Sequence, residues 1–119
     1  MFTISKTFDF SASHILDGLP EGHQCGRLHG HNYKVEVVLE GMALDERGFV
    51  MDYGDLAPFK AYLDDTFDHR HLNDLPAFHG VNPTAENMAR HLHDWCRAEG
   101  WPVARVGVSE TPKTWAWYE

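Results

Sequence analysis

Hydrophobic and polar residues alternate along the first fourteen positions of the chain. One side carries apolar residues and ends at His14, with Lys6 as its single break, and the other side carries mostly Ser and Thr. Residues 29–40 alternate in the same way, with Val38 as the exception. A period of two is typical of a strand with one buried face, so we predict long strands over 2–14 and 29–40.

A helical period follows in the second half of the chain. Apolar residues recur at intervals of three or four over 56–67 and again over 85–98, which predicts two helices with one apolar stripe each. Asp55 is the expected N-cap of the first helix and Thr84 of the second, because both residue types accept hydrogen bonds from the first turn. Gly100 is expected to end the second helix.

The rest of the chain predicts short strands and loops. We expect strands at 48–53, 103–110 and 114–118, and loops at 15–28 and 68–74. Strands and helices in this order indicate an α+β fold, an antiparallel four-stranded sheet with two helices on one face. Such a sheet has two open edges, and open edges are usually blunted or paired, so we expect a homo-oligomer.

Length and composition limit the class of protein. The 119 residues suit a single domain over 1–119. A formal charge of −8 argues against general binding to nucleic acid or to anionic membranes. No apolar run approaches the roughly 18 residues that span a bilayer, and the N-terminus does not resemble a signal peptide. With only two cysteines, Cys25 and Cys96, we expect free thiols and a cytoplasmic protein.

Three of the nine histidines are candidate metal ligands. His29 and His31 lie two apart in the segment C-G-R-L-H-G-H-N-Y, so they point to the same side of the second strand. If the first two strands pair antiparallel, His14 ends the first beside the start of the second. Three imidazoles with a fourth position open are typical of catalytic zinc, although core histidines satisfied by hydrogen bonds are the alternative.

Other residue types near these histidines could carry chemistry. Cys25 could be a fourth ligand that closes a structural site, a free thiol that acts as base or nucleophile, or inert. Asp68 and His69 could form an acid–base pair, and His69 with His71 could form a rival metal site. Glu110, at a strand end, could accept hydrogen bonds from the donor edge of a guanidinium-like ring.

Five motifs occur in order along the chain: F-x-A-S-H, C-G-R-L-H-G-H-N-Y, F-D-H-R-H-L-N, P-T-A-E-N and S-E-T-P. Together they resemble the 6-pyruvoyl-tetrahydropterin synthase family nearly end to end. Cys25 precedes His29 by three intervening residues. This short spacing is similar to the bacterial 6-carboxy-tetrahydropterin synthases of the queuosine (7-deazaguanine) pathway.

The resemblance implies a role for each candidate residue. Zinc would be held by His14, His29 and His31. Cys25 would be the catalytic base rather than a ligand, with His69 and Asp68 as the proton relay. Glu110 would anchor the amino-pyrimidine edge of a pterin, and Thr84 would touch its ring.

The resemblance also implies an assembly and a reaction. The fold would be the tunnelling fold, whose sheets join into a barrel of trimers, often stacked as hexamers, with sites between subunits. The reaction would convert 7,8-dihydroneopterin triphosphate to 6-carboxy-5,6,7,8-tetrahydropterin, with loss of triphosphate and acetaldehyde. The alternatives are a 6-pyruvoyl-tetrahydropterin synthase, a dihydroneopterin-cleaving sister enzyme, or a non-catalytic zinc module. An acidic chain needs local cations for a triphosphate, and Lys113, Arg27 and Arg70 are the candidates.

Overall fold

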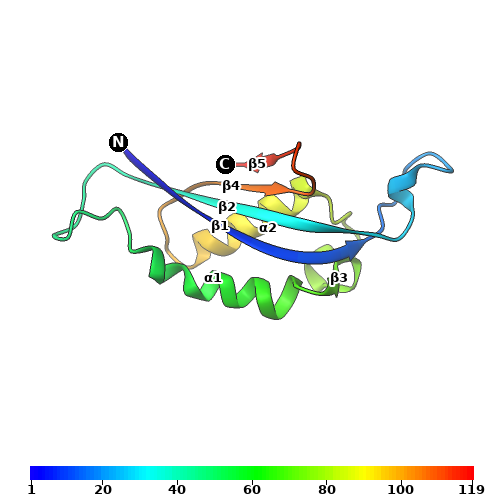
Figure 1. Cartoon of the computed structure of the whole chain (residues 1–119), viewed down its shortest axis with the longest axis horizontal. Coiled ribbons are helices and arrows are strands. Elements are labelled where there is room, and N and C mark those ends of the chain that lie inside the picture. The colour runs from blue at the N-terminus through cyan, green and yellow to red at the C-terminus, as the bar shows by residue number, and fades with distance from the viewer.

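The computed structural model describes all residues, 1–119, and contains one five-stranded sheet with two helices packed on one of its faces (Figure 1). The strand order is β3-β1-β2-β4-β5, and β1 pairs parallel with β3 whereas the other neighbours are antiparallel. The strands are β1 (Phe2–His14), β2 (His29–Gly41), β3 (Arg70–His71), β4 (Val103–Ser109) and β5 (Ala116–Tyr118).

The two long strands, β1 and β2, form the centre of the sheet. They pair without interruption from Phe2 opposite Gly41 to His14 opposite His29, as the alternation predicts. The apolar side of both strands is buried, including Phe10 and Tyr33, whose rings stack with centroids 4.9 Å apart. The opposite side is polar and mostly open to solvent.

The helices cover the apolar side of the sheet. α2 (Ala85–Ala98) begins where predicted, because the Thr84 side chain accepts a hydrogen bond from the Asn87 N–H. α1 (Ala57–Tyr62) is shorter than predicted, since a 3-10 turn (Tyr53–Leu56) precedes it and a π turn (Leu63–Phe67) follows it. The buried side chains of both helices join the core of the sheet.

Two details of the predicted first helix and the strand before it are wrong. Asp52, not Asp55, caps the helical stretch, by accepting a hydrogen bond from the Gly54 N–H. Residues 48–53 do not form a strand. The Asp45 carboxylate instead accepts hydrogen bonds from the N–H groups of Arg47 and Phe49, and such local bonds hold the segment in a turn.

The prediction of a four-stranded antiparallel sheet is also wrong. The sheet has five strands and is mixed, because Arg70 and His71, in the predicted loop 68–74, form β3 parallel to β1. The Asp68 side chain accepts a hydrogen bond from the Ser11 N–H, and the His69 N–H donates one to the Ser11 carbonyl. These two bonds tie the loop to the edge of β1.

No helix of the structure has the length and apolar character needed to cross a membrane.

Candidate metal centre and active site

The three predicted histidine ligands meet at one end of the sheet. His14 ends β1, and His29 and His31 begin β2. Their ligand atoms all lie within 4.8 Å of one another, and the Nε2 atoms of His14 and His29 are 2.9 Å apart. His14 is completely buried, while the other two are half-buried. The sequence therefore predicted correctly which imidazoles come together.

Backbone carbonyls fix the orientation of two of these rings. His14 Nδ1 lies 2.8 Å from the Pro83 carbonyl, and His29 Nδ1 lies 2.6 Å from the Arg27 carbonyl. Because a carbonyl only accepts hydrogen bonds, each Nδ1 carries the hydrogen and donates it. The Nε2 atoms of the neutral rings then present lone pairs toward the same point, as in protein metal sites.

The residues present fit a metal ion. Burial lowers the pKa of His14 and of His31 below the usual value, which favours the neutral imidazole that binds metals. His31 Nε2 is buried and has no hydrogen-bond partner in the chain. A buried polar atom without a partner is costly, and a cation between the three rings would satisfy it. The trio can therefore hold a metal ion.

Two asparagines hold the segment that follows His14. The Asn73 side chain accepts from the Ile15 N–H at 2.9 Å and donates to the Ile15 carbonyl at 2.8 Å. Asn82 makes the same pair of bonds to Asp17, both at 2.8 Å. Neither residue was predicted from the sequence. Their positions in the loop segments H-L-N and N-P-T were the available signal, because Asn side chains in loops often hydrogen-bond to the backbone.

Cys25 lies near this segment but does not join the metal ligands. It is half-buried in a 3-10 turn, Gln24–Gly26, and the group of potential metal ligands contains only histidines. Its carbonyl accepts a hydrogen bond from the Leu16 N–H, which ties the turn to the end of β1. The geometry therefore leaves a coordination position free, and the catalytic role of Cys25 stays a prediction.

The predicted Asp68–His69 pair is formed. Asp68 Oδ2 lies 2.9 Å from His69 Nδ1, and the pKa of Asp68 is lowered by the hydrogen bond from the Ser11 N–H and then by His69. His69 has a positive φ of 58° and an exposed side chain. The strained backbone and the two bonds to Ser11 hold the imidazole at the rim of an open cavity. His71 bonds instead to Ser13, and neither His69 nor His71 belongs to the group of three potential metal ligands.

Glu110 directly follows β4 and lies beside the metal trio. Its Oε2 atom is 3.7 Å from His31 Nε2. It also lines a cavity of about 430 Å³, together with Ala85 and Trp115. Thr84 caps α2 with its hydroxyl and does not line this cavity. The structure thus places Glu110 between the candidate metal site and a space that could hold a small ring.

The fold and the site together define an α+β protein with a three-histidine metal site at one end of a mixed sheet. The chain belongs to the 6-pyruvoyl tetrahydropterin synthase family, whose model matches residues 3–119. The resemblance seen in the motifs is confirmed, and the protein is an enzyme of this family of tetrahydropterin synthases.

Individual relatives agree over most of their length. The 6-carboxy-5,6,7,8-tetrahydropterin synthase of Bacillus subtilis (strain 168) is 32% identical over 127 residues, covering 98% of this chain and 84% of the relative. The 6-pyruvoyl tetrahydrobiopterin synthase of Homo sapiens is 35% identical over 106 residues, covering 76% and 71%. The solved structure of Caenorhabditis elegans 6-pyruvoyl tetrahydropterin synthase superimposes with a TM-score of 0.87 at 28% identity, covering 99% of this chain and 94% of that chain.

Proposed function

We propose that the protein converts 7,8-dihydroneopterin triphosphate and water to 6-carboxy-5,6,7,8-tetrahydropterin, acetaldehyde and triphosphate, a step of queuosine biosynthesis. Relatives such as the Bacillus subtilis enzyme carry the name of this product. The observation that carries the proposal is the convergence of three imidazoles with Glu110 3.7 Å from one of them. A pterin held by Glu110 would extend its side chain toward the metal ligands.

Zinc is the metal we propose for this site. Three neutral imidazole nitrogens with room for a further ligand are typical of catalytic zinc. Bound there, zinc would polarise the hydroxyl groups of the substrate side chain and acidify the neighbouring bonds. The carbonyls of Pro83 and Arg27 would hold two of the three imidazoles, those of His14 and His29, in the orientation that binds the ion.

Three groups of residues would share the remaining chemistry. Cys25, as a thiolate, would remove a proton from the side chain of the substrate, and His69 would move a proton with Asp68 stabilising its charged form. Glu110 would accept hydrogen bonds from the amino-pyrimidine edge of the ring. Thr84 remains a proposed ring contact, although its hydroxyl already accepts a bond from the Asn87 N–H.

We further propose that residues 1–119 form a single catalytic domain that works in the cytoplasm as a homo-oligomer, a trimer or hexamer with a barrel of joined sheets. The exposed side chains of Trp115 and Trp117 at the edge strand β5 support an assembly, because exposed aromatic residues are common at interfaces. Sedimentation of the purified protein tests it, and a particle with the mass of one chain would contradict it.

The decisive experiment is product analysis by mass spectrometry. Zinc-loaded protein is incubated with 7,8-dihydroneopterin triphosphate, and we expect 6-carboxy-5,6,7,8-tetrahydropterin together with acetaldehyde. The human relative favours a second candidate, formation of 6-pyruvoyl-tetrahydropterin. That reaction releases triphosphate but no acetaldehyde, so the aldehyde separates the two activities.

A further inference from the structure

Tyr33 is a buried aromatic residue beside the metal trio, and the proposed function does not use it. It follows His31 by two positions in β2, so both side chains lie on the helix-covered face of the sheet. Only 1% of Tyr33 is exposed. Its ring stacks on that of Phe10, its partner in β1, with centroids 4.9 Å apart and 15° between the planes. The core therefore fixes the position of the Tyr33 ring.

The hydroxyl group of Tyr33 lies against the face of the His14 imidazole. Its oxygen is 3.3 Å from Nδ1 and 3.5 Å from Nε2, and the two rings are perpendicular, at 90°, with centroids 6.1 Å apart. An atom almost equidistant from both ring nitrogens lies along the N–H or lone-pair direction of neither. In the plane of the ring it would overlap Cε1, which lies between the nitrogens. The hydroxyl therefore contacts the ring from one side.

Two contacts of different direction define the orientation of His14. The Pro83 carbonyl accepts a hydrogen bond from Nδ1 at 2.8 Å, which fixes one end of the ring. The Tyr33 hydroxyl, on the face of the ring, limits its tilt. His31 Nε2, in contrast, has no partner in the chain, and His14 is the only completely buried ring of the trio. We therefore expect His14 to be the most rigid of the three ligands.

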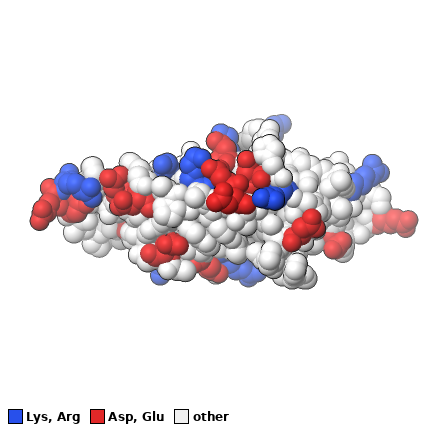
Figure 2. All heavy atoms as spheres, turned by 90° about the horizontal axis from the view of Figure 1, so that it is seen from below, with Lys and Arg blue, Asp and Glu red and all other residues white.

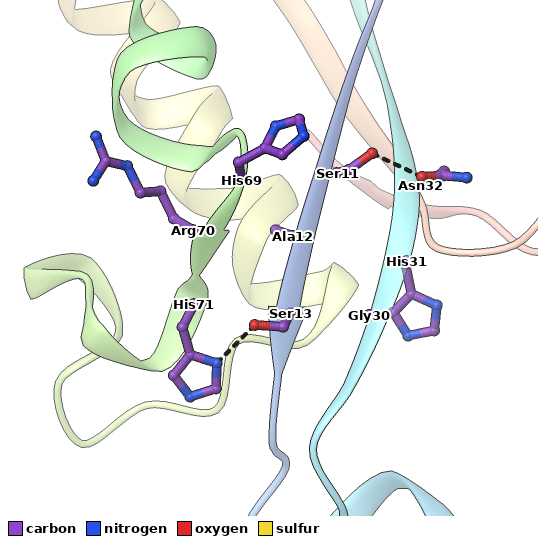
Figure 3. A pocket seen from close by; sticks show the side chains of 9 residues that line it. All are labelled: Ser11, Ala12, Ser13, Gly30, His31, Asn32, His69, Arg70 and His71. Carbon is purple, nitrogen blue, oxygen red and sulfur yellow. Dashed lines mark hydrogen bonds between the residues drawn. The ribbon is translucent and has the colours of Figure 1, made fainter.

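The polar face of the sheet gives the ligands no such support. A cavity of about 480 Å³ opens there, and Figure 3 shows the side chains that line it. Ser11 donates a hydrogen bond to Asn32, and Ser13 shares one with His71, as the dashed lines in the figure mark. None of these four side chains hydrogen-bonds to an imidazole of the trio. The groups that orient His14 therefore come from the helix-covered side of the sheet.

Both groups that orient His14 are neutral. A carboxylate often orients a metal-bound histidine, and the chain has 18 Asp and Glu residues. Acidic side chains recur at the surface along the face in Figure 2, and no Asp or Glu is among the buried residues. A buried carboxylate would be costly whenever the metal is absent. A carbonyl and a hydroxyl avoid this cost, so the metal-free chain can keep the same orientation of His14.

We infer that Tyr33 is a positioning residue of the metal site, whose hydroxyl limits the tilt of the His14 ring and so keeps Nε2 directed at the metal. Tyr33 is too deeply buried to touch a substrate, so it acts through His14. The inference rests on the metal site of the proposed function and does not depend on which pterin is formed. It extends the support of the site from the backbone carbonyls to the aromatic core, through the stacked ring of Phe10.

Tyr33→Phe tests the inference, because it removes the hydroxyl and keeps the ring that stacks on Phe10. Zinc affinity is measured by competition with a chromogenic chelator. We expect Tyr33→Phe to bind zinc about 10-fold more weakly, at the lower end of the effect of groups that orient a ligand, since the Pro83 carbonyl remains. Cobalt(II) in place of zinc gives a visible spectrum that depends on the arrangement of the ligands, and this spectrum should change in Tyr33→Phe.

Tyr62→Phe is the matched control. It also removes a hydroxyl that bonds to a histidine, His91 Nε2 at 2.7 Å, but His91 is outside the group of potential metal ligands. Its zinc affinity should stay within about twofold of the wild type. Urea unfolding of the metal-free proteins, with a chelator present, checks that both variants keep the fold.

Three results would overturn the inference. The first is a Tyr33→Phe protein that binds zinc as tightly as the wild type and has the same cobalt spectrum. The second is an equal loss of zinc affinity in Tyr62→Phe, which would show that any lost hydroxyl has this effect. The third is a wild-type protein that binds no zinc, which would remove the metal site as well. Zinc binding without a pterin product would instead contradict only the proposed reaction.

Discussion

The position of one hydrogen on each imidazole decides what the histidine trio can do. In His14 and His29 the carbonyls of Pro83 and Arg27 hold that hydrogen on Nδ1, so the Nε2 lone pairs lie 2.9 Å apart without a proton between them. Two lone pairs at this distance repel each other unless a cation lies between them. The alternation of residues along the two strands predicted that the three rings lie close together. It could not predict the hydrogen bond of His14 to the Pro83 carbonyl, which is 69 residues away in the sequence.

Replacing one ligand tests this geometry at the residue scale. His29→Ala should lower zinc affinity by at least about 100-fold, because loss of a ligand exceeds the roughly 10- to 100-fold effect of changing a residue that only orients a ligand. Competition with a chromogenic chelator measures the affinity. His79→Ala, which changes an exposed loop histidine outside the trio, is the control. Equal affinities of the two variants would show that the rings do not bind the metal together.

Cys25 allows a second prediction at this scale. Since its sulfur does not join the three imidazoles, Cys25→Ala should retain zinc, while turnover falls by about 100- to 10,000-fold, as expected for loss of a catalytic base. Metal content is measured by atomic absorption and turnover by acetaldehyde release. Gln24→Ala in the same turn is the control. Loss of zinc from Cys25→Ala would favour the non-catalytic module with a closed four-ligand site.

β5 pairs with β4, and the Trp117 ring of β5 lies against Gly107 of β4. This contact gives a prediction at the scale of elements. A Cβ atom at Gly107 would lie 2.7 Å from the Trp117 ring, closer than van der Waals contact allows. Gly107→Ala should therefore destabilise the protein by about 1–3 kcal/mol, the usual cost of overpacking. Urea unfolding measures this loss. Gly26→Ala is the matched control, since its nearest atom is the Leu16 carbonyl at 3.8 Å, and an equal loss in both variants would contradict the argument.

The elements with a strong period were predictable, and so was the short strand β5, whereas β3 and the turn at 48–53 were not. The pairing of β1 with β2, and the start of α2 after Thr84, follow from alternation and from capping. β3 contains only Arg70 and His71, too few residues to show any period, and it exists because Asp68 and His69 bond to Ser11. The apolar residues at 48–53 looked like a strand, yet the carboxylates of Asp45 and Asp52 accept hydrogen bonds from nearby N–H groups and fold the segment locally.

At the scale of the whole molecule, the candidate site gathers residues from distant parts of the sequence. The strands supply the metal ligands, the loop before α2 supplies Pro83, and the end of β4 supplies Glu110. The sequence predicted which three imidazoles meet, because their residue type and spacing are specific. The loop positions of Asn73 and Asn82 were a signal for amides that bond to the backbone, but their partners, Ile15 and Asp17, are set only by the tertiary fold.

Global stability should depend on pH through a half-buried histidine far from the metal site in sequence. His91 Nε2 lies 2.7 Å from the Tyr62 hydroxyl, and burial lowers the pKa of His91 below its usual value despite the attraction of Asp94. The unfolded chain takes up a proton as the pH falls through about 6.5. The folded chain does so only at lower pH, so the unfolded state gains free energy in that interval.

The free energy of unfolding should therefore be largest above about pH 6.5 and fall as the pH is lowered, by up to about 1.4 kcal/mol per pH unit for this one group. Urea unfolding at a series of pH values, with a chelator present to remove metal linkage, measures the slope. His91→Gln keeps an amide that can accept from Tyr62 and cannot titrate, so its slope should be shallower. The remaining slope should come in part from His14 and His31, whose pKa values are lowered by burial as well. A His91→Gln protein with the full slope of the wild type would show that His91 is not the titrating group.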